Sequence, residues 1–229
     1  MAIAKTKGFL PVLAALVGNA LVTIFKVIAA TASGSSAMFS EAIHSFADTS
    51  NQALLLIGVT RSGKKPTSEF AYGFGNERFF WALISACGIF FVGAGVTMYH
   101  GIEALQHPKP IEISTLTFSV LGVAFVVEAL TLWVALRSLA RSFPKATWME
   151  RFELADPSTL AVCLEDGVAV FGVVVAAVSI VTSYVTGNPR WDAIGSIIIA
   201  TLLGIVAVTL IAKNRSYLIG RAIPAEDKE

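Results

Sequence analysis

Six apolar stretches, each about as long as a membrane is thick, dominate the sequence. They cover approximately residues 8–31, 37–60, 79–102, 114–136, 158–185 and 191–212. Roughly 20 helical residues, each adding 1.5 Å, are needed to cross about 30 Å of hydrocarbon, so every stretch is long enough. Hydrophobic residues make up 55% of the chain and charged ones only 14%, well below the share in soluble domains. The sequence therefore predicts an all-α integral membrane protein with six transmembrane helices.

Lysine and arginine gather on one side of this predicted bundle. Fourteen of the 17 lie before the first stretch or in the segments after the second, fourth and sixth. Cytoplasmic loops carry an excess of these residues, so we expect both termini to lie in the cytoplasm. The expected membrane is the cell (inner) membrane, with an organellar membrane as the alternative. We expect a transmembrane domain over 1–213, a short cytoplasmic tail over 214–229 and no soluble C-terminal domain in this chain. The net charge of +1 argues against a nucleic-acid partner.

Five acidic or imidazole side chains lie well inside the apolar stretches. They are His44, Asp48, Glu128, Glu165 and Asp166. Ionisable groups cost free energy in hydrocarbon, so they usually face a cavity or a partner. Counting 1.5 Å per residue puts His44 and Asp48 about 10 and 16 Å below the outer face, and Asp166 about 18 Å below it. Glu128 lies about 21 Å down by the same count, so these groups share a level near the midplane.

His44 and Asp48 are four residues apart, and this spacing places them on one face of a helix. An imidazole with carboxylates suits zinc, and also manganese, iron or cobalt. The same side chains could instead bond each other or nearby Ser and Asn side chains and so hold helices together. They could also relay protons. Spacing alone leaves these three roles open.

Several motifs resemble the cation diffusion facilitator family. They are SGSSAMFSEAIHSFAD (33–48), TRSGKKP (60–66), AYGFGNERF (71–79), YHGI (99–102), WDAIGSIII (191–199) and NRSYLIGRAIP (214–224). The resemblance covers nearly the whole chain in order. It implies a six-helix bundle of the family type, a homodimer, and export of a divalent metal in exchange for protons. It also implies metal ligands at His44, Asp48 and Asp166.

The sequence departs from the family pattern at the fourth ligand position. That position is Val162, four residues before Asp166, and its side chain cannot bind metal. The run LEDGVAVFG (164–172) resembles the zinc transporter nine-like branch. Water could fill the fourth position, and Glu128, Cys163 and Glu165 are candidates for a further ligand or proton relay. We expect Asn51 to orient the Asp48 carboxylate. We expect Lys26 to extend its amine to the outer interface, with pairing to a carboxylate as the alternative.

These expectations combine into a proton-coupled exporter that works by alternating access. Zinc is the expected cargo, with manganese, iron or cobalt as alternatives, and we expect no cofactor and no enzymatic activity. Metal ions, protons, the lipid bilayer and a second copy of the chain are the expected partners. The alternative is a non-transporting partner subunit or metal sensor, which Val162 and the lack of the family's tail domain favour.

Overall fold

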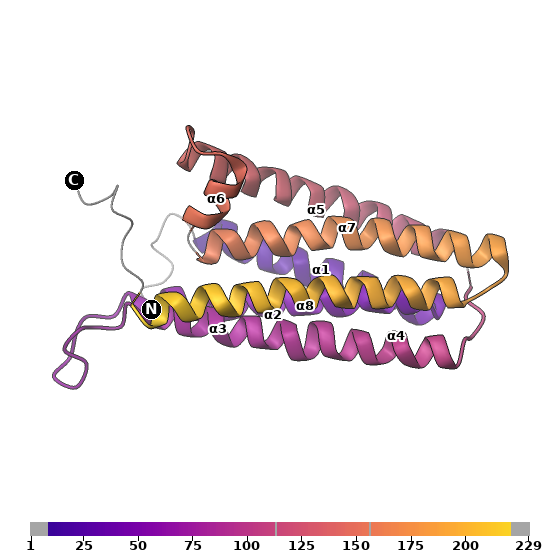
Figure 1. The fold of residues 1–229 in the computed structure, drawn as a ribbon, viewed down its shortest axis with the longest axis horizontal. Helices are drawn as coiled ribbons and strands as arrows, with labels where there is room; N and C mark the ends of the chain where they lie inside the picture. The colour runs from indigo at the N-terminus through magenta and orange to yellow at the C-terminus, as the bar shows by residue number, and fades with distance from the viewer. Residues whose placement is uncertain (1–8, 113, 156, 221–229) are drawn as a thin grey trace.

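The fold is a set of long helices lying side by side (Figure 1). The computed structural model describes residues 9–112, 114–155 and 157–220, which contain no strand. The long helices are α1 (Phe9–Ser33), α2 (Ser36–Ser62), α5 (Thr115–Ser142), α7 (Pro157–Thr186) and α8 (Arg190–Leu218). A sixth rod joins α3 (Glu77–Gly88), the π-helical segment η2 (Ile89–Val96) and α4 (Thr97–Gln106). The prediction of an all-α membrane protein is confirmed.

Five of the six rods are long and apolar enough to cross a membrane. Among the described helices of this length, α2 is the exception, although it spans 27 residues. Its apolar character is diluted by buried polar side chains, among them Ser40, Glu41, His44 and Asn51. In a lipid environment such groups must be satisfied inside the protein. The polar helix packs against α1, α3, α4, α7 and α8.

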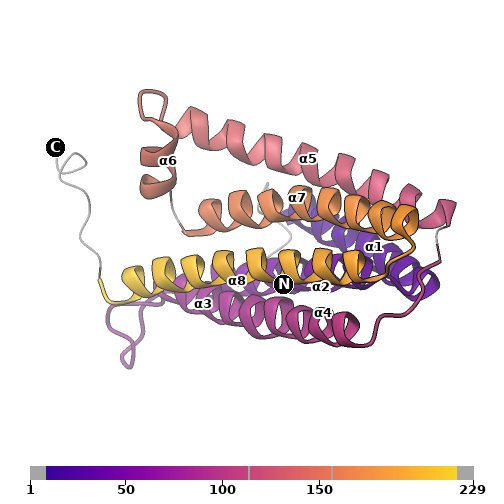
Figure 2. The same ribbon diagram turned by 45° about the vertical axis from the view of Figure 1, so that its right-hand side comes forward.

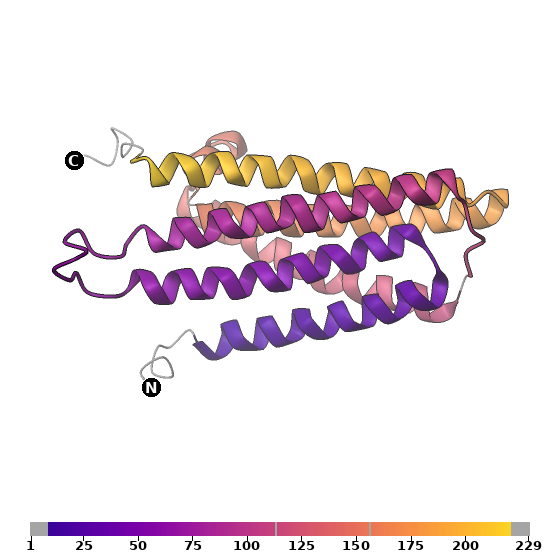
Figure 3. The same ribbon diagram turned by 90° about the horizontal axis from the view of Figure 1, so that it is seen from below.

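Four helices form a bundle, and two rods cover one side of it. α1 packs against α2 and α5, and α7 packs against α5 and α2. α8 and the α3–α4 rod pack against each other and against α2 (Figure 3). The 63–76 loop, the start of α1 and the end of α8 lie together at one end (Figures 1 and 3). We call this the basic end, after Arg61, Lys64, Lys65, Arg141 and Lys145, and the opposite end the far end.

Most observed helices run past the apolar stretches. α5 continues to Ser142 and α8 to Leu218, several residues beyond the apolar stretches that end near 136 and 212. Apolar residues mark only the part of a helix that crosses hydrocarbon, whereas the helix continues into the interface until a cap or turn ends it. The division at residue 213 lies within α8 and stays a prediction.

A short helix, α6 (Trp148–Leu154), joins α5 to α7 and was not expected (Figure 2). It begins with a capping box, in which the Thr147 side chain accepts from the Glu150 amide and the Glu150 carboxylate accepts from the Thr147 amide at 2.7 Å. This reciprocal bonding satisfies two amides that would otherwise lack partners. The sequence signal was the Thr147–Glu150 spacing itself.

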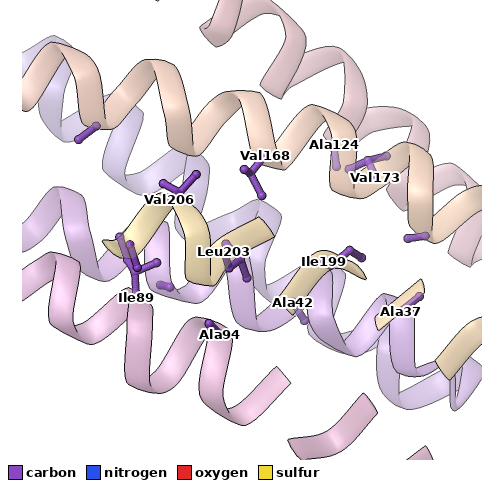
Figure 4. Packing of buried hydrophobic residues seen from close by; sticks show 14 of the residues in the cluster. Ala37, Ala42, Ile89, Ala94, Ala124, Val168, Val173, Ile199, Leu203 and Val206 are labelled. Carbon is purple, nitrogen blue, oxygen red and sulfur yellow. The ribbon is translucent and has the colours of Figure 1, made fainter. Parts of the chain in front are cut away.

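Small residues let the rods approach closely at the centre of the molecule. Ala37 and Ala42 of α2, Ala94 of η2 and Ala124 of α5 are buried in one cluster with larger side chains from α8 (Figure 4). A Cβ added at Gly101 would lie 2.9 Å from the Ser196 hydroxyl oxygen. Helix association in lipid depends on such close packing, because lipid is as apolar as the helix surfaces.

At the far end, α8 holds the first turn of α2. Asp192 is 2% exposed, and its Oδ1 accepts from the Ser35 hydroxyl at 2.6 Å. Its Oδ2 accepts from the Ser36 amide at 2.5 Å. The Ser35 side chain in turn accepts from the Met38 amide as the N-cap of α2. Asp192 therefore fixes where α2 begins.

Candidate metal-binding site

One face of α2 carries a column of polar side chains that point into the bundle. Glu41, His44, Asp48 and Asn51 follow one another at spacings of three or four residues, which is the spacing of a helix face. Glu41 and His44 are 0% exposed, Asn51 is 3% exposed, and the Asp48 side chain is 16% exposed. The column therefore meets other helices rather than lipid.

Asp48 faces a small cavity between α1, α2, α5 and α7. The polar residues that line it are Asn19, Ser45, Asp48, Glu128, Thr131 and Asp166. Its volume is about 20 Å³. That is room for about one water-sized particle. Carboxylates from α2, α5 and α7 therefore line a single site, as the depth count for Asp48, Glu128 and Asp166 indicates.

The carboxylates around this cavity are incompletely bonded. Asp48 Oδ1, Glu128 Oε2 and Asp166 Oδ2 are buried and have no hydrogen-bond partner among the described residues. Buried polar atoms are otherwise almost always paired. Three residues that line one cavity thus each leave a carboxylate oxygen unpaired. Such a group of oxygens attracts a cation, which can be shared among them where a hydrogen-bond donor is missing.

His44 adjoins this site from the side of α2. Its Nε2 lies 3.3 Å from Asp48 Oδ2, and neither ring nitrogen has a hydrogen-bond partner in the described part of the chain. His44 is not among the residues that line the cavity with Asp166. Among the described residues, no three His, Cys, Asp or Glu side chains stand close enough to hold one metal ion. Holding an ion between His44, Asp48 and Asp166 requires movement from this conformation.

Glu165 and Asp166 follow each other on α7 but take part in different contacts. Glu165 is 6% exposed, and its Oε2 accepts from the Asn51 amide nitrogen. The Asn51 carbonyl oxygen accepts from the Ser85 hydroxyl on α3. Asn51 therefore links α2 to α7 and α3, instead of contacting Asp48 as the sequence suggested. Cys163 is buried on α7 and does not line the cavity.

Lys26 is not at the interface, so the expectation that it extends there is wrong, and the alternative of pairing with a carboxylate holds. Its side chain is 0% exposed, and Nζ lies 2.8 Å from Glu41 Oε2 and 2.6 Å from Glu128 Oε1. Two carboxylates on neighbouring helices supply both the countercharge and the hydrogen-bond acceptors that a buried ammonium needs. The overlooked signal was Glu41, which lies one turn before His44 on the same face of α2.

A larger cavity opens at the far end. Its volume is about 470 Å³, and His100, Glu103, His107, Lys109 and Asp192 are among the residues that line it. His100 packs against Phe39, with ring centroids 4.3 Å apart. Asp192 is already bonded to α2, as described above. Imidazole groups are present here, but the unpaired buried carboxylates are at the middle of the bundle.

Comparison with known proteins finds one matching family model and several similar proteins. Residues 12–219 match the model of the cation efflux transmembrane domain. The chain is 44% identical over 218 residues to the "proton-coupled zinc antiporter SLC30A9, mitochondrial" of Mus musculus, and 43% identical over 219 residues to the Homo sapiens protein of that name. Each alignment covers 94% of this chain and 38% of the relative.

A plant relative is similar over a slightly shorter region. "Metal tolerance protein C4" of Arabidopsis thaliana is 41% identical over 198 residues, which are 85% of this chain and 43% of that protein. The chain therefore spans less than half the length of these three relatives.

Proposed function

Because this chain belongs to the cation efflux family, we propose that it exports divalent metal ions, foremost zinc, in exchange for protons. The names of the relatives, a proton-coupled zinc antiporter and a metal tolerance protein, support this cargo and this coupling. Manganese, iron or cobalt are the alternatives that a site of imidazole and carboxylates would also bind. Membership of a family of transporters also supports the expectation that the protein is not an enzyme.

The observation that carries the proposal is the cavity shared by Asp48 and Asp166. These residues lie on α2 and α7, and each leaves one buried oxygen without a partner in the described structure. We propose that these two carboxylates and the His44 imidazole hold the ion in the loaded state. The ligands must then be two ionised carboxylates and a neutral imidazole, because metal binding needs their free lone pairs.

Transport follows if the helices that carry these ligands rock between two arrangements. In one arrangement the cavity opens to the basic end and takes up the ion, and in the other it opens to the far end. Protons on the far side compete for the same oxygen and nitrogen atoms and displace the ion. An imidazole suits this exchange, because its ordinary protonation change falls nearest to neutral pH.

The protein is a multi-pass membrane protein, and we propose that the basic end faces the cytoplasm or its topological equivalent. An organellar membrane fits the word "mitochondrial" in the names of the mouse and human relatives. The cell membrane is the other candidate. A second copy of the chain is the proposed partner, which the family resemblance implies.

Zinc flux into proteoliposomes under a pH gradient tests this function. We expect gradient-driven flux for the unaltered chain, and flux no greater than that of empty vesicles for Asp48→Ala and Asp166→Ala. Glu69→Gln is the matched control, because it also removes a carboxylate but lies exposed in the 63–76 loop. Undiminished flux in both alanine variants would exclude this site, and absence of flux in the unaltered chain would exclude transport.

A metal-binding subunit or sensor that does not transport is the second candidate. The observation in its favour is Val162, which is 40% exposed and stands where the resemblance expects a fourth ligand. The two candidates differ in one respect. Saturable zinc binding in detergent without any flux in proteoliposomes would favour the sensor.

A further inference from the structure

Glu128 belongs to two clusters at once. Its Oε1 lies 2.6 Å from Lys26 Nζ, within the buried group formed by Lys26, Glu41 and Glu128. Its Oε2 has no partner among the described residues, and the side chain lines the cavity that holds Asp48 and Asp166. One carboxylate thus connects a buried internal cation with the proposed metal site.

We propose that Lys26 is a tethered counter-cation that competes with the transported metal for Glu128. In the empty protein Lys26 holds Glu128 through an ion pair. When a divalent cation enters the cavity, Glu128 shares its second oxygen with the ion and loosens its contact with Lys26. Glu128 thereby supplies the ligand that Val162 cannot. This inference rests on the proposed function, because it assigns further residues to the same site.

Because of Glu41, the Lys26 ammonium can release Glu128 and still keep an ion-pair partner. A buried charge that loses its only partner is strongly destabilising. Lys26 has two partners, since its Nζ also lies 2.8 Å from Glu41 Oε2. It can therefore remain paired while Glu128 turns to the ion.

The surroundings of the two glutamates differ in the way that this exchange requires. Glu41 is 0% exposed, and its Oε1 lies directly against α7 at Gly172, where a Cβ would overlap it. The Glu128 side chain is 13% exposed and borders the cavity. Glu41 is thus the fixed partner of Lys26, and Glu128 is the one with room to move.

Calorimetric titration of zinc into the purified full chain tests the competition. The double variant Lys26→Gln/Glu41→Gln removes one positive and one negative charge together, which leaves the net charge unchanged and Glu128 free. We expect it to bind zinc about tenfold more tightly, or more, because Lys26 no longer competes for Glu128. The added change Glu128→Gln should cancel this gain. A purely structural role for Lys26 would lower the melting temperature and weaken zinc binding instead.

A second variant acts in the opposite direction. Glu41→Gln leaves Lys26 paired with Glu128 alone, so zinc binding should weaken, and this loss should shrink in a Glu128→Gln background. This double-mutant cycle isolates the coupling between Glu41 and Glu128. It tests the competition for Glu128 even if Lys26→Gln/Glu41→Gln does not fold.

The outcomes separate the two proposals. If Asp48→Asn and Asp166→Asn weaken zinc binding while Lys26→Gln/Glu41→Gln binds no more tightly than the unaltered chain, the metal site stands and the counter-cation is overturned. A Glu41→Gln effect of equal size with and without Glu128 overturns it as well. An unaltered chain that binds no zinc overturns both proposals.

Discussion

Two buried polar clusters join α2 to its neighbours, and they differ in how completely they are bonded. At the far end, both carboxylate oxygens of Asp192 accept hydrogen bonds from the first turn of α2. At the middle of the bundle, Asp48, Glu128 and Asp166 each leave a buried oxygen without a partner in the described structure. Both clusters are built on carboxylates with buried oxygen atoms, although Asp192 is 2% exposed and the Asp48 and Glu128 side chains are 16% and 13% exposed. What differs is whether the protein itself supplies the partners.

This difference separates structural carboxylates from ligand carboxylates. A fully bonded buried carboxylate stabilises the contact in which it takes part, and its loss leaves donors without acceptors. An incompletely bonded one contributes little to folding and is available to a cation. We therefore expect substitutions in the two clusters to affect different properties of the protein.

The largest contrast comes from the same chemical change made in both clusters. Asp48→Asn should abolish zinc flux and leave the melting temperature unchanged or higher, because it removes a carboxylate whose buried Oδ1 has no partner in the described structure. Asp192→Asn places an amide donor against the donors of α2 and should lower the free energy of unfolding by about 2–3 kcal/mol. Flux per folded molecule and thermal unfolding in detergent measure the two effects. Equal losses of stability in the two variants would contradict the proposed difference between structural and ligand carboxylates.

Gly172→Ala tests whether the ion-pair part of the central cluster is as tightly packed as the far end. A Cβ at this position would overlap Oε1 of Glu41. We expect a loss of about 1–3 kcal/mol in unfolding free energy, together with reduced flux, because Glu41 must move. Gly122→Ala on α5 is the control, since no described atom outside its own helix turn lies within 4 Å of an added Cβ. An equal effect of both alanines would contradict the packing.

Asn51→Ala tests whether a bonded residue near the central cavity contributes to stability or to zinc binding. Asn51 bonds Glu165 and Ser85, so its loss should destabilise the fold by about 1–2 kcal/mol. The zinc dissociation constant should change by less than about tenfold. A much larger loss of zinc affinity at an unchanged melting temperature would instead show that Asn51 orients the Asp48 carboxylate.

The smallest effect is expected outside the membrane-spanning helices. Thr147→Ala removes the capping box of α6 and should lower the stability of that helix by about 1 kcal/mol. Hydrogen exchange of the α6 amides should accelerate, while zinc flux stays the same. A clear fall in flux would show that the connection between α5 and α7 contributes to transport.

Counting residues along each helix predicted a part of this arrangement. It placed Asp48 and Asp166 at one depth, and the structure finds both at one cavity. Depth follows from the fixed rise of a helix and needs no knowledge of neighbours. The partners of Lys26 and Asn51 could not be found in this way, because they depend on how α1, α3, α5 and α7 are rotated about their own axes. Helix rotation is set by packing between helices rather than by the spacing of residues within one.

Anomalous diffraction or cryo-electron microscopy of the protein loaded with zinc would show directly whether the ion binds between Asp48, Asp166 and His44. We predict one ion at the middle of the bundle, within about 2.0–2.2 Å of a carboxylate oxygen from each of Asp48 and Asp166 and of a His44 nitrogen. The far-end cavity at His100 and His107 should hold no ion at stoichiometric zinc. An ion bound at the far end with the central cavity unchanged would contradict the account.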